Sequence, residues 1–212
     1  MLADQKRPTK RAPPSARPTP ALPWALNQSL VLIIDIEKDM LGLESGVVRL
    51  TPYKQEWVRL FQEEKSRLFA ALVEDILDIQ HVGSTSIPGM IAKPIIDIAI
   101  AVKNFEEASV CIKPIEQLGY EYKGEFGIPR RHYFVKGNPR THHIHMNDIG
   151  SSDWKDQITF RNYLIRHPEI AKEYAELKLK SAQRYPTDRQ AYTDSKTSFV
   201  NHVLELAGSE LL

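Results

Sequence analysis

A strand-like run leads into a turn of glycine and hydroxyl residues at positions 81–89, which read His-Val-Gly-Ser-Thr-Ser-Ile-Pro-Gly. Backbone N–H groups at such a turn can hold phosphate oxygens, and Gly83 permits a close approach. The turn is not a Walker loop, because its second glycine comes one residue too late and Met90 stands where lysine should follow. Gly83, Ser84 and Ser86 are therefore candidate phosphate contacts, although turns of this composition are more often purely structural.

A single carboxylate, Asp97, interrupts the apolar run 95–102. An unpaired charge in such a strand would be costly, so this side chain needs a partner. One interpretation is a structural hydrogen bond to Ser84 or to backbone N–H groups. The other is a Mg²⁺ ligand that presents nucleotide phosphates to an attacking group. The local sequence leaves both interpretations open.

Two histidines, His143 and His145, alternate with His142, Ile144 and Met146. On a strand, the alternation points the first two to one face of the sheet and the other three to the opposite face. Combined with a carboxylate, the pair would form a transition-metal site. The same side chains could instead bind phosphate or hydrogen-bond within the sheet.

Basic and aromatic side chains elsewhere could complete a phosphate site. Arg131 follows a Gly-Ile-Pro turn and could clamp phosphate with its guanidinium, or simply be solvated. Arg189 and Lys196 are seven residues apart and would share one face of a C-terminal helix, with Tyr192 nearby, as a cationic and aromatic lid. An ordinary amphipathic helix would explain that spacing equally well. Lys93 is a similar candidate with less support.

Several motifs occur in the order found in a known family, and together they are similar to the GrpB family signature over residues 46–207. The segments that carry the resemblance are 81–89, 93–98, 141–145, 160–164, 167–168 and 192–196, which read HVGSTSIPG, KPIIDI, THHIH, FRNYL, HP and YTDSK. The resemblance implies a nucleotidyltransferase fold, in which the Gly-Ser turn and an acidic strand face each other across a cleft. It also implies that the strands of Asp97 and His143 are neighbours.

The sequence departs from the wider nucleotidyltransferase superfamily at Ala99. Active members of that superfamily pair two carboxylates one residue apart and add a third from another strand. With Asp97 alone in the pair, the sequence argues against a two-metal mechanism. Mg²⁺ and a transition metal remain alternative ions that Asp97, His143 and His145 could bind. Asp97 is the candidate catalytic residue.

The elements that must position these residues follow from hydrophobic periodicity. The predicted strands lie at 76–82, 95–102, 120–123, 132–136 and 142–146. The predicted helices lie at 53–72, 104–119, 154–166, 169–184 and 188–207. Alternation in the second strand places Asp97, Ala99 and Ala101 on a face of small residues with room for a ligand. The predicted fold class is α/β (α+β), with a nucleotidyltransferase-like mixed sheet, flanking helices and a C-terminal helical segment.

Length and composition indicate one main core within 212 residues. Residues 1–23 contain six prolines among basic and small residues and are predicted to be disordered. Residues 24–45 form an extension whose apolar run, 30–36, is expected to pack on the domain at 46–207, and residues 208–212 end the chain. The single cysteine, Cys111, excludes an internal disulfide and suits a reducing compartment.

The distribution of charge and the N-terminal sequence limit the classes of binding partner that we expect. The net charge is +1, and the basic excess lies in the tail, while the remainder carries no recognised nucleic-acid reader, which argues against nucleic acid as a partner. Asn27, Gln28 and Asp35 interrupt the early apolar stretch, so we expect neither export nor a membrane partner, and a cytoplasmic location.

Two functions are compatible with these patterns. The first is a nucleotidyltransferase-like protein that binds a nucleotide or related phosphorylated small molecule and transfers a nucleotidyl group to an acceptor. The second is a non-catalytic accessory or interaction module with a protein partner, linked to coenzyme A metabolism, because the resemblance extends to domains fused to dephospho-coenzyme A kinase. Residues 81–89 contain no Walker loop, so they do not supply the kinase activity itself.

Overall fold

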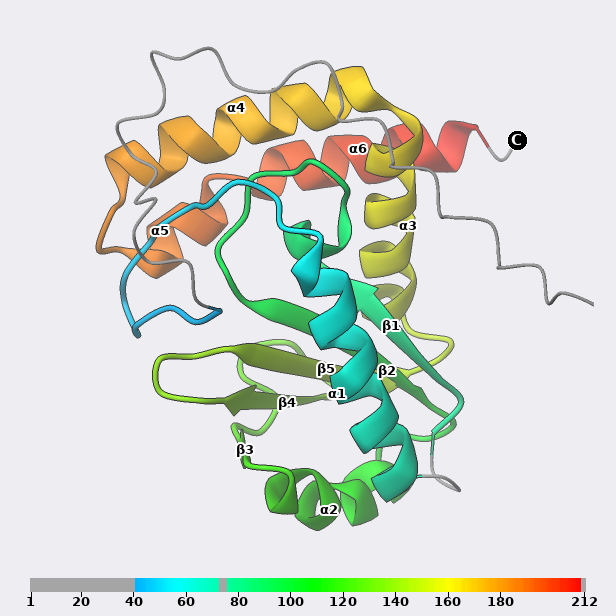
Figure 1. The fold of residues 1–212 in the computed structure, drawn as a ribbon. Coiled ribbons are helices and arrows are strands. Elements are labelled where there is room, and N and C mark those ends of the chain that lie inside the picture. The colour runs from blue at the N-terminus through cyan, green and yellow to red at the C-terminus, as the bar shows by residue number, and fades with distance from the viewer. Residues whose placement is uncertain (1–40, 73–75, 211–212) are drawn as a thin grey trace, which may run out of the picture.

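The computed structural model describes residues 41–72 and 76–210 (Figure 1). The predictions for the basic tail and for the apolar run 30–36 lie outside these residues. The last part of the expected extension, residues 41–45, is described and packs on the domain. Leu43 is buried there, and its backbone pairs with Arg140 in an isolated bridge.

A five-stranded mixed sheet forms the centre of the molecule, as the sequence predicted. Its strand order is β1-β2-β5-β4-β3. The central pair, β2 and β5, runs parallel, whereas the other neighbouring pairs run antiparallel. The strands are β1 (Asp78–Val82), β2 (Ile96–Val102), β3 (Tyr120–Tyr122), β4 (Arg131–Lys136) and β5 (His142–Asp148). The parallel pairing brings the starts of β2 and β5 side by side, which decides where the candidate site lies.

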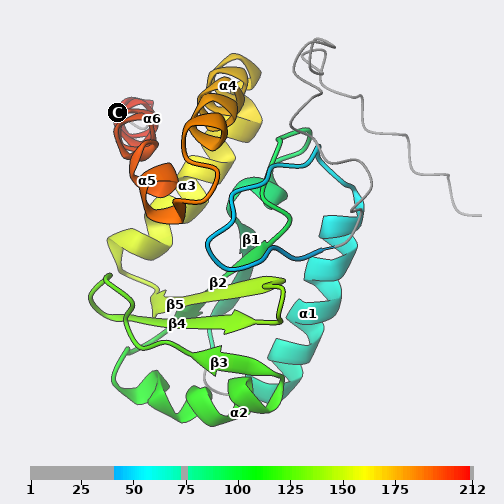
Figure 2. The same cartoon turned by 90° about the vertical axis from the view of Figure 1, so that its left-hand side faces the viewer.

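One face of the sheet is covered by α1 (Glu56–Leu72) and α2 (Ile112–Gln117), as Figures 1 and 2 show. The predicted alternation in β2 is confirmed, because Ile96, Ile98, Ile100 and Val102 all face this layer and join its core. The segment before α2 begins as a 3₁₀ helix, Glu107–Cys111, rather than as the expected α-helix. The Asn104 side chain, two residues before its N-cap Glu106, accepts hydrogen bonds from the Glu106 and Glu107 amides and stabilises the turn that leads into it.

The opposite face is covered first by α3 (Ser152–Arg166). Trp154 of this helix packs with Ala99 and Ala101, which are fully buried. The predicted open face of small residues is therefore wrong for most of its length, because the small side chains admit a helix rather than a ligand. The open part is confined to the end of β2 that carries Asp97.

The C-terminal helices build a second hydrophobic cluster above this face (Figure 2). They are α3, α4 (Pro168–Arg184), α5 (Arg189–Asp194) and α6 (Thr197–Ser209). Their buried members include Tyr163, Leu164, Ala175, Leu179, Tyr192 and Val203. Within the described ranges, no helix combines the length and the apolar character needed to cross a membrane.

The chain after Asp188 forms two helices, so the prediction of one continuous helix at 188–207 is wrong. A hydrogen bond from the Lys196 amide to the Thr193 carbonyl tightens the end of α5, and α6 starts at the next residue. The break falls in a Thr-Asp-Ser cluster, whose side chains compete with helical backbone bonds. Arg189 and Lys196 therefore do not share a face of one helix, and Lys196 lies at the junction between α5 and α6.

Candidate functional site

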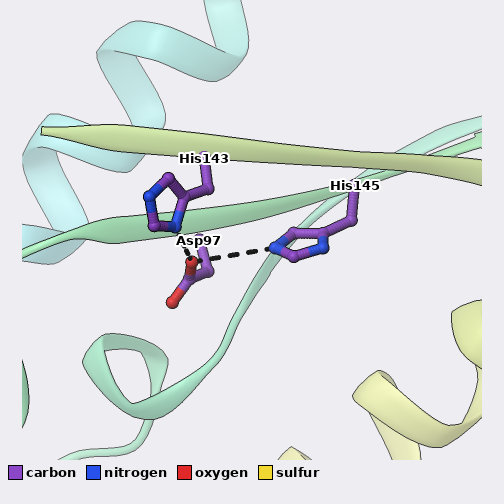
Figure 3. Close-up of side chains that lie close together, drawn as sticks. All are labelled: Asp97, His143 and His145. Carbon is purple, nitrogen blue, oxygen red and sulfur yellow. Dashed lines mark hydrogen bonds and ion pairs between the residues drawn. The ribbon is translucent and has the colours of Figure 1, made fainter. Parts of the chain in front are cut away.

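Asp97, His143 and His145 converge at the sheet face, as Figure 3 shows. Asp97 pairs in register with His143 across the parallel strands, and His145 is two residues further along β5 on the same face. Nδ1 of His143 lies 2.9 Å from Oδ1 of Asp97, and Nε2 of His145 lies 3.8 Å from the same oxygen. The expected convergence of these three side chains is confirmed.

An arginine contacts the far nitrogen of each histidine in this cluster. Nη2 of Arg189 donates to Nε2 of His143 at 3.4 Å, and Nη1 of Arg131 donates to Nδ1 of His145 at 3.3 Å. Because a guanidinium can only donate, each contacted nitrogen must be an acceptor. A neutral imidazole then carries its proton on the other nitrogen, which in both rings is the one that faces Asp97.

The electrostatics agree with an ionised carboxylate beside a neutral His143 ring. Burial alone would raise the pKa of Asp97, but the contacts with His143 and His145 outweigh it and hold that pKa well below its usual range. Burial lowers the pKa of His143, and the hydrogen bond to Asp97 opposes this shift only in part. Asp97 is therefore held charged, and its first partner is His143 rather than Ser84 or a backbone amide.

Gly83 is required by its close approach to the carboxylate. Its φ is +66°, in the left-handed region, and a Cβ built there would lie 2.5 Å from Oδ2 of Asp97. No other residue type could occupy this position without moving the aspartate. The Gly-Ser turn and the acidic strand thus face each other, as the family resemblance implied.

The hydroxyl residues of the turn have different environments. Ser84 lines a small cavity beside Asp97. Thr85 also borders it, but its hydroxyl bonds to Nε2 of His81 and to the Ile95 carbonyl, which fixes the turn between β1 and β2. Ser86 donates to the Gly83 carbonyl at 2.6 Å and is not among the cavity residues, so its hydroxyl stabilises the turn.

The cavity has a volume of about 70 Å³ and is lined by several ionisable side chains. Pockets that enclose a whole drug-sized ligand span roughly 300–1,000 Å³, so this one matches a single small group. Three lysines and one carboxylate are among its walls. The lining residues are Ser84, Thr85, Lys93, Asp97, Tyr174, Lys178, Tyr192 and Lys196.

All three lysines of the cavity have lowered pKa values because they are buried close to one another. Burial and nearby cations lower the pKa of Lys93 to about 8 and that of Lys196 to about 7. The same causes hold the pKa of Lys178 well below its usual range. Lys178 donates to the Ile91 carbonyl, whereas the ammonium of Lys196 lies 3.6 Å from the centre of the Tyr192 ring. The cavity therefore disfavours the charged form of each lysine unless an anion is bound there.

Sequence reasoning missed Lys178 and Tyr174, which α4 contributes to the cavity. A signal existed, because Lys178 falls on the stripe formed by Ala171, Ala175 and Ala182 and so occupies a core-facing position. A lysine on an otherwise small and apolar stripe indicates a buried cation. Tyr174, one turn before Lys178, lies against the same wall and faces Ser84.

Arg131 differs from its expected role. Its side chain is buried, and its guanidinium donates to the Glu125 and Phe126 carbonyls and to His145. These hydrogen bonds occupy the guanidinium N–H donors that were expected to bind phosphate. Arg131 also does not line the cavity. Its place on β4, directly beside the strand of His145, explains the difference. Arg189, from the start of α5, reaches the cluster as a contact of His143.

The family follows from the match to a family model. Residues 47–206 match the model described as GrpB protein. The chain belongs to the GrpB family. A crystal structure of GrpB from Enterococcus faecalis is similar to this structure, with a TM-score of 0.71 and 37% identity over 76% of this chain and 98% of that one.

Curated relatives of this GrpB-family chain share the same region. The UPF0157 protein YqkA of Bacillus subtilis is 43% identical over 76% of this chain, and the match spans 47% of the relative's own length. The glutamate-rich protein GrpB of Alkalihalophilus pseudofirmus is 36% identical over 78% of this chain and 98% of its own length. A dephospho-CoA kinase of Mycolicibacterium paratuberculosis is 26% identical over 70% of this chain and 43% of its own length.

Proposed function

We propose that this GrpB-family protein binds a nucleotide and holds one phosphate group in the lysine cavity. The observation that carries the proposal is the convergence of Lys93, Lys178 and Lys196 on a space that fits one small anionic group. Bringing three ammonium groups together without a counter-charge is unfavourable, and Asp97 offsets a single charge. A phosphate oxyanion supplies the missing charge, and Ser84 offers it a hydroxyl donor.

The sugar and base of the nucleotide extend outside this cavity, because its volume of about 70 Å³ admits little more than the phosphate. Binding through phosphate in a narrow cationic space fits the class of nucleotides and related phosphorylated small molecules. It gives no reason for a nucleic-acid duplex as the partner, since a long backbone could present only a terminal phosphate to so confined a site.

The binding that we propose needs no metal ion held by the Asp97 cluster. The three ligand atoms do lie within 4.8 Å of one another. A metal ion, however, would take the lone pairs of the ring nitrogens that face Asp97, and each ring proton would move to the nitrogen contacted by Arg131 or Arg189. Two N–H donors would then oppose each other, the reverse of the acceptor that normally supports a metal-bound histidine.

Transfer of the nucleotidyl group is the finer form of the proposal. The acceptor's hydroxyl oxygen would bond to the α-phosphorus while the bond to the β-phosphate breaks, so that pyrophosphate leaves and the hydroxyl proton is released to solvent. Asp97 is the one acidic residue among the described lining residues that could hold this hydroxyl. Its low pKa makes it a weak base, so its strength lies in orienting the hydroxyl. The lysines would stabilise charge that develops on the phosphate.

A second candidate function is the accessory module linked to coenzyme A metabolism. The specific observation in its favour is the similarity to a dephospho-CoA kinase, whose match with this chain spans 43% of the kinase. Such a module would use the same lysine cavity to hold a phosphorylated precursor without converting it. Product formation separates the two functions, because the accessory role predicts binding without turnover.

The experiment is a calorimetric titration of the full chain with nucleoside triphosphates, inorganic tripolyphosphate and coenzyme A precursors, without added metal. Binding should weaken at least tenfold in Lys178→Met and Lys196→Met, because each removes a charge-assisted contact. Lys180→Met is the matched control, since Lys180 is exposed on the same helix as Lys178. Equal affinity in all three variants would refute the cavity as the binding site.

A further inference from the structure

The loop that joins β3 to β4 holds an aromatic side chain in the open beside the site. Phe126 is 63% exposed, whereas the ring that it stacks on, Tyr133, is buried. An isolated exposed phenylalanine has no meaning by itself. The exposure of Phe126 is informative, because the conformation and the hydrogen bonds of its loop hold this side chain in place.

Two backbone positions of the loop have unfavourable conformations. Phe126 has a φ of +47° and Arg130 a φ of +60°, and they are the two non-glycine residues with positive φ in the described ranges. Bulky side chains rarely adopt this region, and such outliers persist where the surrounding structure enforces them, often at ligand sites. Both positive-φ outliers of the described residues therefore occur in one short loop next to the candidate site.

Hydrogen bonds to the loop backbone enforce this conformation. The buried guanidinium of Arg131 donates to the carbonyls of Glu125 and Phe126. The Glu125 carboxylate accepts from the Arg130 amide at 2.6 Å, and the Tyr133 amide donates to the Gly124 carbonyl at 2.9 Å. The exposure of Phe126 thus belongs to a tied loop rather than to a loose one.

A continuous row of rings connects Phe126 to the Asp97 cluster. The Phe126 and Tyr133 rings stack with centroids 5.1 Å apart. The Tyr133 ring is 5.6 Å from His143 and 5.2 Å from His145. Two ring-to-ring steps therefore separate the exposed aromatic from the histidines that contact Asp97, which itself lines the cavity.

We propose that Phe126 is the stacking surface for the nucleobase of the ligand whose phosphate occupies the lysine cavity. The inference rests on the proposed nucleotide binding and adds the part of the ligand that the cavity cannot enclose. Stacking on one aromatic face accepts any base, so Phe126 distinguishes a nucleotide from a simple phosphorylated compound rather than one base from another. Arg131 acts as a positioning residue, because it holds both the loop carbonyls and His145.

The test compares a nucleoside triphosphate with inorganic tripolyphosphate by calorimetry on the full chain. Phe126→Ala should weaken nucleotide binding about 5- to 100-fold, the range measured for loss of one base–aromatic stack, and leave tripolyphosphate binding unchanged. Phe126→Trp should keep nucleotide affinity within about twofold, because an aromatic face remains. Phe69→Ala is the matched control, since Phe69 is a phenylalanine of α1 with 55% exposure, outside the site.

The outcomes separate this inference from the function on which it rests. Wild-type protein that binds tripolyphosphate, together with a Phe126→Ala variant that binds nucleotide normally, would overturn the stacking role and leave the phosphate cavity intact. An equal loss for both ligands in Phe126→Ala would assign Phe126 to the structure of the loop and overturn the inference as well. Wild-type protein that binds neither ligand would refute the proposed function and the stacking role together.

Discussion

Binding of a phosphate group should draw protons onto the cavity lysines, and the size of this uptake can be worked out from their pKa values. In the ligand-free protein at pH 8, Lys196 is mostly neutral with a pKa of about 7, and Lys93 is half-protonated with a pKa of about 8. A bound oxyanion offsets the burial and the mutual repulsion that lower these pKa values. If both return to their ordinary value, roughly one to two protons are taken up per ligand at pH 8.

The assay is isothermal calorimetry at pH 8 in two buffers with different ionisation enthalpies. A nucleoside triphosphate is suitable, because its phosphates are fully ionised at this pH and supply no competing titration. Affinity should also fall roughly 10- to 100-fold per pH unit above pH 8, since each bound ligand takes up one to two protons. Lys196→Arg should remove about one proton from the uptake, because arginine is charged before the ligand arrives. Binding heats that are identical in the two buffers would refute the reasoning.

Three further predictions concern stability and metal binding. In the ligand-free protein, the free energy of unfolding should rise by roughly 2 kcal/mol per pH unit from pH 7 to pH 9, because the unfolded chain binds protons that the buried Lys93 and Lys196 have lost. Urea denaturation of wild type and Lys196→Met should show a smaller rise in the variant. Gly83→Ala should lower the free energy of unfolding, measured by urea denaturation, by roughly 3 kcal/mol or more, because its Cβ would collide with Asp97. Gly127→Ala is the control: Gly127 has a φ of +83° but open space around it, so this change should lower the free energy of unfolding by only about 1 kcal/mol. Zinc titrations should show no binding to Asp97, His143 and His145 in wild type. Replacement of both Arg131 and Arg189 by methionine should create zinc binding there, because the two competing N–H donors are removed. Zinc binding to His143 and His145 of the wild type, detected by NMR, would contradict the proton positions inferred for these rings.

Part of the fold and the site could be predicted because the relevant signals are local. A period of two residues fixes which side chains of β2 face the core, and the same period brings His143 and His145 to one face. The turn at Gly83 was predictable from its glycine and hydroxyl residues. Pairing of β2 with β5 depends on contacts between distant segments, so it came from the family resemblance rather than from periodicity.

The remainder depends on tertiary environment. Arg131 could not be assigned from sequence, because its bonding partners are carbonyls of a loop whose shape no local pattern specifies. Lys178 was missed because lysines on amphipathic helices are usually solvated, and its burial depends on how α4 docks. The end of α5 near Ser195 has no glycine or proline, so the helical period seemed to continue through it.

The cavity lies where two separately packed hydrophobic clusters meet. Asp97 belongs to the sheet, whose core is shared with α1 and α2, whereas Lys178 and Tyr192 belong to helices that pack around their own cluster. In folded proteins generally, separately packed regions can open locally with different free energies. A phosphate held by residues from both would act as a bridge between them and make their unfolding more cooperative. In this arrangement the ligand contributes to the integrity of the whole molecule as well as occupying a site on it.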